Sequence, residues 1–243
     1  MNIVDEGYII DLRKHGDKSL ILTVLTKHNG KLIGYVKGAL NKKTFSTFQL
    51  GNLVHIQGYA RLDENMLSFK VELISPIAVS FMSSPQKLEV LSSFCALCHD
   101  CFVEKEPLER FFYYVDSFFS FINEENWLTH YAFFEYHLLN FLGVGLDLSE
   151  CSATGVTENL EYVSPKSGKA VCATAGEPYK DRLYKFPRFV VENNYMPSDL
   201  EVLDLLEMTE FFLNKNFFKA HGLKFPIKRA NLREITVEYK EAV

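Results

Sequence analysis

The first 80 residues alternate between apolar and polar positions with the two-residue period of β-strands. The clearest segment is 67–73, in which every odd position is apolar and every residue between is polar or charged. Five such segments are predicted to be strands: 7–14, 19–26, 30–37, 53–61 and 67–74. Asn29-Gly30 separates two of them and is typical of a tight hairpin. Five short strands indicate a small closed or nearly closed barrel, for which an OB-fold and a Tudor- or SH3-like barrel are open alternatives.

After Ser75-Pro76 the apolar positions recur with helical spacing. Four helices are predicted, at residues 84–102, 106–122, 126–142 and 198–219. Ser198 with Glu201 forms a capping-box pattern at the start of the last helix. Between the third and fourth helices, about residues 146–190 are irregular, and a small hairpin is expected around Pro165–Gly168. We therefore predict an α+β fold, with a barrel domain at 1–80 and a helical domain at 81–243 that carries the hairpin as an insertion.

Charge is distributed unevenly along the chain. The protein has 26 basic and 31 acidic residues, yet residues 18–62 contain no Asp and no Glu. Residues 1–80 hold ten Lys and Arg against seven Asp and Glu, whereas residues 81–243 hold 16 against 24. A basic patch on an acidic protein indicates a polyanionic partner, although a solvated, lysine-decorated sheet is an equally open interpretation.

One predicted strand joins this charge to an aromatic ring. Lys31, Ile33, Tyr35 and Lys37 share one face of the segment 30–37. Two ammonium groups beside a tyrosine are suited to a phosphate backbone and a stacked base. The alternative is that Ile33 and Tyr35 pack inward and the lysines extend around them.

Two cysteine clusters have metal-ligand spacing. On a helix, Cys95, Cys98 and His99 lie on one face, but buried thiols in an apolar helix are commoner than zinc ligands. Cys151 and Cys172 stand at the two ends of the predicted hairpin region, where paired C-x-x-C motifs would indicate a zinc site. Only the first cysteine of each pair is present, so we expect a degenerate zinc knuckle without metal.

Other functional classes have no support in the sequence. There is no G-x-S-x-G, P-loop, G-x-G-x-x-G or H-E-x-x-H motif, so we do not expect an enzyme. The acidic N-terminus lacks the apolar core of a signal peptide, and no apolar run is long enough to span a bilayer. We expect a cytoplasmic protein that makes no contact with membranes and keeps its five cysteines reduced.

Four segments together resemble the RecO family of bacterial DNA repair proteins. These are Asp5-Glu6-Gly7 with His15–Ser19, Leu25–Lys31 with Val36–Ala39, Leu142–Cys151, and Tyr162–Val171 with Gly176–Tyr179. The last two are the most specific in order and spacing. Thr154 and Ala175 replace the second cysteines of the family's four-cysteine zinc site.

The resemblance implies an N-terminal OB-fold, a helical domain and a recombination mediator of the RecF pathway that is associated with the nucleoid. Such a protein binds single- and double-stranded DNA and anneals complementary strands. With RecR it helps load RecA onto DNA coated by single-strand-binding protein, whose acidic C-terminal tail it also binds. The expected DNA-binding residues are Lys27, Lys31, Tyr35, Lys37, Lys42, Lys43 and Arg61.

Three questions stay open at the level of sequence. The barrel is either a DNA-annealing site or an adaptor for acidic peptides. The cluster Lys224, Lys228, Arg229 and Arg233 is either an additional binding site or a clamp on the acidic C-terminal segment. A metalloenzyme built on Cys95, Cys98 and His99 is the third and least supported hypothesis.

Overall fold

The computed structural model describes residues 2–41, 44, 46–62, 66–192 and 194–232. They form two compact units. The first contains residues up to Asn123 together with Pro226–Leu232, and the second contains Glu124–Phe225. The helices before residue 123 are grouped with the barrel in this division. The predicted domains, 1–80 and 81–243, stay a prediction.

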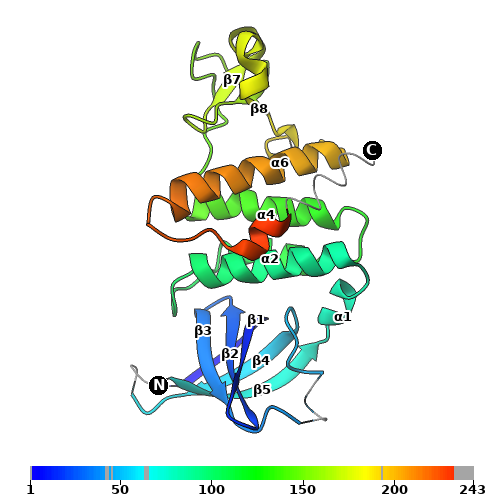
Figure 1. Ribbon diagram of the computed structural model, residues 1–243, viewed down its shortest axis with the longest axis vertical. Coiled ribbons are helices and arrows are strands. Elements are labelled where there is room, and N and C mark those ends of the chain that lie inside the picture. Colours follow the sequence, from blue (N-terminus) through cyan, green and yellow to red (C-terminus); the bar gives the residue numbers. More distant parts are fainter. Residues whose placement is uncertain (1, 42–43, 45, 63–65, 193, 233–243) are drawn as a thin grey trace. The chain divides into compact units, whose positions relative to one another are not determined.

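The first unit contains a closed five-stranded barrel with the strand order β1-β2-β3-β5-β4 (Figure 1). Its strands are β1 (Asn2–His15), β2 (Ser19–Thr26), β3 (Gly30–Val36), β4 (Leu53–Tyr59) and β5 (Leu67–Ser75). β1 is longer than predicted because its first half pairs with β4 and its second half with β2. The one parallel pairing, between β3 and β5, closes the barrel. The predicted α+β fold with an N-terminal OB-type barrel is confirmed.

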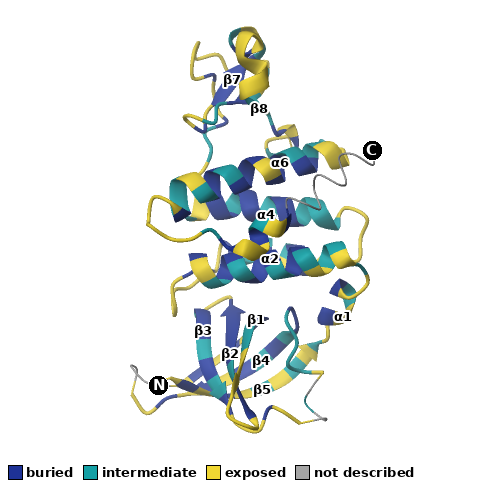
Figure 2. Cartoon of the chain, viewed as in Figure 1, coloured by how far each residue is buried: buried dark blue, intermediate teal, exposed yellow. Residues whose placement is uncertain are grey.

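The alternation of the strands separates the barrel core from its surface (Figure 2). Residues such as Leu22, Val24, Leu32 and Ile56 are fully buried in this core. Phe69 fills the space over two glycines. A Cβ added at Gly34 would lie 2.5 Å from the Phe69 ring, and one added at Gly58 would lie 3.1 Å from it. These positions lack side chains because the ring occupies the volume.

The first unit also contains α1 (Ala78–Phe81), α2 (Pro85–Cys101) and α3 (Phe112–Ser120), and residues 227–232 add a further helical segment. The Tyr8 ring of β1 stacks on Phe119 with centroids 3.9 Å apart, and its hydroxyl donates to Asp116 at 2.6 Å. α3 is shorter than the predicted helix 106–122. The N–H groups of Lys105 and Leu108 bond instead to the carbonyls of Lys31 and Lys27, so this segment follows the barrel rather than forming helical turns.

The second unit is built around α4 (Trp127–Phe141) and α6 (Asp199–Phe212), which pack together. The hydroxyl of Thr209 in α6 donates to the buried Glu135 of α4 at 2.6 Å. The capping box predicted at Ser198 and Glu201 is present. The predicted last helix continues beyond α6 as a π-helical segment, η3 (Leu213–Phe218).

The segment between α4 and α6 contains the predicted hairpin. β6 (Leu160–Val163) pairs with β7 (Ala170–Cys172), and β8 (Tyr184–Lys185) joins the other edge of β6. Short helical turns α5 (Ala173–Gly176), η1 (Glu177–Arg182) and η2 (Arg188–Val190) complete it. Its likeness to a zinc knuckle stays a prediction. Across the described part of the chain, no helix is long and apolar enough to cross a membrane.

Candidate nucleic-acid interface

The outward face of β3 carries the residues that the alternation predicted. Leu32 and Val36 point into the barrel core, whereas Ile33 and Tyr35 are only half-buried and Lys37 is exposed just after the strand. Inward packing of Ile33 and Tyr35, the alternative interpretation, is therefore wrong. The face that they share is the outside of the barrel.

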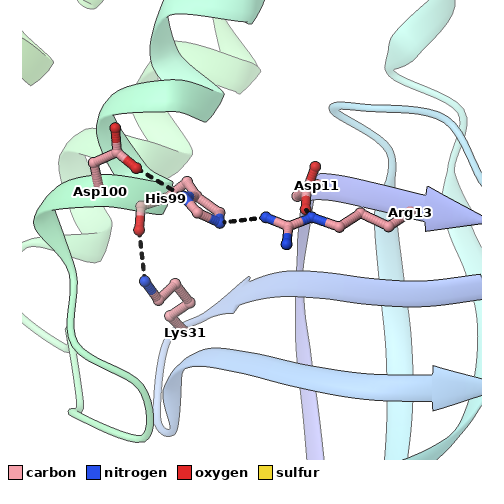
Figure 3. Close-up of polar contacts among 5 residues, drawn as sticks. All are labelled: Asp11, Arg13, Lys31, His99 and Asp100. Carbon is pink, nitrogen blue, oxygen red and sulfur yellow. Dashed lines mark hydrogen bonds and ion pairs between the residues drawn. The ribbon is translucent and has the colours of Figure 1, made fainter. Parts of the chain in front are cut away.

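Lys31 was predicted to contact DNA from the exposed face of this strand, but the structure buries it. Its side chain is only 8% exposed, and its Nζ donates to the carbonyl oxygen of His99 at 2.6 Å (Figure 3). Burial lowers the pKa of this ammonium group, which the carboxylates of Glu104 and Asp100 partly offset. Because the last turn of α2 covers this end of β3, Lys31 packs against that helix and is not available to bind DNA from solution.

Neighbouring polar groups link β1 to the same end of α2 (Figure 3). Arg13 Nη2 lies 3.0 Å from His99 Nε2, and His99 Nδ1 lies 2.8 Å from Asp100 Oδ1. Since a guanidinium only donates, His99 Nε2 accepts and its Nδ1–H donates to Asp100. Arg13 Nε also donates to Asp11 at 2.7 Å. Carboxylates thus neutralise the cationic charge here, which makes this corner a poor site for DNA phosphates.

The opposite end of β3 carries cations that take part in none of the ion pairs formed by the described residues. Lys14 and Lys18 flank the tip of the β1–β2 hairpin, and Lys37 follows β3 beside them. The backbone contact Leu40 N–Lys18 O, at 3.1 Å, holds the segment after β3 against this tip. Lys14, Lys18 and Lys37, here termed the hairpin-end cluster, are all exposed. Neither Lys14 nor Lys18 was among the predicted DNA-binding residues. Asp11 and Asp17 on either side of Lys14 placed it outside the acid-free stretch, which Lys18 begins.

A cavity of about 740 Å³ adjoins the hairpin-end cluster. Its walls are mainly apolar, with Lys14 and Asn41 as the polar lining; the apolar residues are Leu12, Leu20, Ala39, Leu40 and Phe48. This cavity combines an apolar lining with the ammonium group of Lys14. It suits a ligand with both an apolar surface and negative charge.

Tyr35 is held in one orientation beside this cluster. Its hydroxyl donates to Ser19 Oγ at 2.8 Å, and its ring meets His15 edge-on at a centroid distance of 5.7 Å. A ring fixed in this way loses little conformational entropy when it stacks on a base.

The other predicted residues do not gather at one place. Lys27 is exposed in the β2–β3 turn, beside the ion pair of His28 with Glu109, and Arg61 is exposed after β4. Lys42 and Lys43 lie outside the described residues, as does Arg233. Arg229 is 1% exposed, so its side chain is not available to a ligand at the surface, and the role of Lys224 and Lys228 stays a prediction.

Neither cysteine cluster forms a metal centre in the described parts of the chain, where no group of three or more potential His, Cys, Asp or Glu ligands occurs. Cys95 and Cys98 are buried, and burial raises the pKa of both thiols. Thr154 Oγ1 lies 3.6 Å from Cys172 Sγ. A hydroxyl there satisfies the thiol by hydrogen bonding rather than by ligation.

The five-stranded OB-type barrel with a basic end, followed by a helical region, places this chain among the OB-fold proteins that carry an additional helical part. The family model described as Recombination protein O N terminal matches residues 1–77, and the model described as Recombination protein O C terminal matches residues 82–224. The chain belongs to the RecO family. Membership gives it a role in DNA repair and recombination.

Individual relatives agree with the family models. The chain is 38% identical to the DNA repair protein RecO of Wolbachia sp. subsp. Drosophila simulans over 231 residues, covering 91% of this chain and 95% of the relative. It is 34% identical to the DNA repair protein RecO of Bartonella quintana over 237 residues, or 95% and 96% of the two chains. It is 36% identical to that of Xanthobacter autotrophicus, covering 95% of each chain.

Proposed function

We propose that this protein is a non-enzymatic recombination mediator that binds single- and double-stranded DNA through its barrel and anneals complementary strands. With RecR it helps load RecA onto DNA coated by single-strand-binding protein. Family membership supports the recombination partners. The hairpin-end cluster supports direct DNA binding, and it is the observation that carries the proposal.

The chemistry of annealing suits this surface. Two phosphate backbones repel each other, so an annealing protein neutralises them while leaving base edges free to pair. Lysines do this by displacing condensed counterions, with little preference for sequence. Lys14, Lys18 and Lys37 present three such charges at one end of the barrel, against one carboxylate at the hairpin tip, that of the exposed Asp17. Residues 18–62 contain no carboxylate side chain.

The test is single-stranded DNA binding across a salt series. The double variant Lys18→Glu/Lys37→Glu is compared with Lys166→Glu/Lys219→Glu, which makes the same charge change at exposed lysines of the second unit. We expect the slope of log affinity against log salt to shrink by about 0.7 for each phosphate that the first variant no longer neutralises. The control keeps the wild-type slope. Circular dichroism confirms that each variant is folded.

Different failures have different meanings. An equal decrease of affinity in both variants would show that only net charge matters, and the hairpin-end cluster would not be the site. Undiminished binding by Lys18→Glu/Lys37→Glu would move the DNA site away from this end of the barrel. Absence of salt-dependent binding by the wild type would overturn the proposed DNA-binding function itself.

An acidic-peptide adaptor is the alternative function, and the cavity beside Lys14 favours it. Apolar walls with a lysine at the margin fit a peptide that carries both carboxylates and apolar side chains, such as the acidic C-terminal tail of single-strand-binding protein. A fluorescent acidic peptide and an oligonucleotide of equal charge, titrated at equal ionic strength, separate the two. Preference for the peptide, with no annealing activity, would favour the adaptor.

A further inference from the structure

Tyr59 is an exposed aromatic residue within a barrel strand. Its side chain is 58% exposed, although it lies at the end of β4 with strands on both sides. The inward residues of β4, Val54 and Ile56, are fully buried, so Tyr59 is not needed to fill the barrel.

The strand register places Tyr59 in one row with Tyr35. Ser68 of β5 pairs with Tyr35 on one side and with Tyr59 on the other. The three residues lie on the outer face, and the exposed Ser68 stands between the two tyrosines in the strand register. Neighbouring strands are about 4.8 Å apart, so the backbones of the two tyrosines are separated by roughly 10 Å. That leaves room for each ring to take a different base.

Cations flank this row. Lys70 lies opposite Gln57 in the β4–β5 register, which places it diagonally next to Tyr59 on the same face. Arg61 follows Tyr59 by two residues, and Lys37 follows Tyr35 by two. All three cations are exposed. The first acidic residue along this face of β5 is Glu72, which is opposite His55 and beyond Lys70.

We propose that Tyr35 and Tyr59 form a two-base stacking platform for single-stranded DNA, with Lys70 and Arg61 contacting the phosphates on the Tyr59 side. This inference rests on the proposed DNA-binding function and assigns part of its ligand contacts. Unpaired bases offer faces for stacking, whereas bases in a duplex are already stacked on one another. The platform therefore selects single strands, while the hairpin-end cluster serves any phosphate backbone.

The test compares Tyr59→Ala with Tyr59→Phe, and uses Tyr113→Ala as the matched control. Tyr113 is 70% exposed and belongs to α3, not to a barrel strand. Removal of one stacking ring weakens binding by about fivefold to a hundredfold. We expect that decrease for Tyr59→Ala with single strands, near wild-type binding for Tyr59→Phe and Tyr113→Ala, and unchanged affinity for duplex DNA.

A second measurement uses the wild-type protein and does not depend on how a variant folds. Oligonucleotides carrying 5-iodouracil are crosslinked by light, and the attachment site is found by mass spectrometry. Crosslinks at Tyr59 or Tyr35 support the platform. If the wild type binds single strands but Tyr59→Ala binds equally well, or duplex affinity falls in parallel, the platform is wrong and the proposed function stands. If the wild type binds no DNA, the proposed function fails first.

Discussion

The side chain of Lys31 reaches from β3 to the last turn of α2, where its ammonium group donates to the carbonyl oxygen of His99. Carbonyls in the last turn of a helix lack partners within the helix, and a cation there also meets the negative end of the helix dipole. Lys31, which belongs to the acid-free stretch of the sequence, thus connects α2 to the barrel by a hydrogen bond.

Replacing Lys31 is therefore expected to affect stability and not DNA binding. Lys31→Met lowers the free energy of unfolding by about 1 kcal/mol, because removing the hydrogen bond outweighs the relief of burying a charge. Urea denaturation measures this change. The salt dependence of DNA binding stays that of the wild type; a reduced slope would instead place Lys31 on the DNA.

Gly34 and Phe69 should show strong coupling in a double-mutant cycle. Gly34→Ala places a methyl group 2.5 Å from the Phe69 ring and destabilises the barrel by about 1–3 kcal/mol. Phe69→Leu, which removes the ring, recovers part of that stability when the two changes are combined. Gly58→Ala, with its closest approach at 3.1 Å, costs less. Additive effects of Gly34→Ala and Phe69→Leu would contradict this account of barrel packing.

The buried hydroxyl of Thr209 is expected to stabilise the packing of α6 on α4. Thr209→Val keeps the shape but removes the donor to Glu135, whose side chain is fully buried. The unfolding free energy falls by about 1–3 kcal/mol. Thr209→Ser retains the hydroxyl and serves as the control. If the serine variant is destabilised as much as the valine variant, the methyl group and not the hydrogen bond is responsible.

Stability is expected to fall with acidification below pH 6.5. Burial lowers the pKa of His137 from 6.5 to about 4. Between these values the unfolded chain binds a proton that the folded protein does not, so stability rises with pH across this window and is lost as pH falls. His137 is partly exposed, which limits its share to on the order of 1–2 kcal/mol. His137→Gln should flatten the pH dependence of urea midpoints between pH 6.5 and 4; an unchanged profile would contradict this assignment.

The barrel could be predicted from sequence because each of its strands has one face in the core. Leu67, Phe69 and their counterparts on the other strands determine which side chains point inward, and Asn29-Gly30 marks a turn. Helix starts were equally visible where a local signal exists, as at Ser198. The hairpin of β6 and β7 was found through its turn residues.

The features that sequence patterns could not predict depend on contacts between distant segments. Alternation shows that Lys31 is on the outer face of β3, but not that α2 covers that part of the face. Likewise, the row formed by Tyr35 and Tyr59 follows from the parallel pairing of β3 with β5, which strand patterns do not reveal. The periodicity likewise predicted a helix over 106–122. Lys105 and Leu108 instead donate backbone hydrogen bonds to the barrel, and α3 begins only at Phe112.

The discontinuity of the first compact unit has a consequence for synthesis in the cell. Arg229 and Leu232 are each 1% exposed within a unit whose other residues end at Asn123. A ribosome makes the barrel first, then residues 124–225, and only afterwards the segment 226–232 that belongs to the first unit. Until then the nascent barrel unit leaves uncovered the surface that residues 226–232 will bury. Its last packing step thus waits until residues 124–225 have been made, and a pause in translation before residue 226 would expose that surface to chaperones.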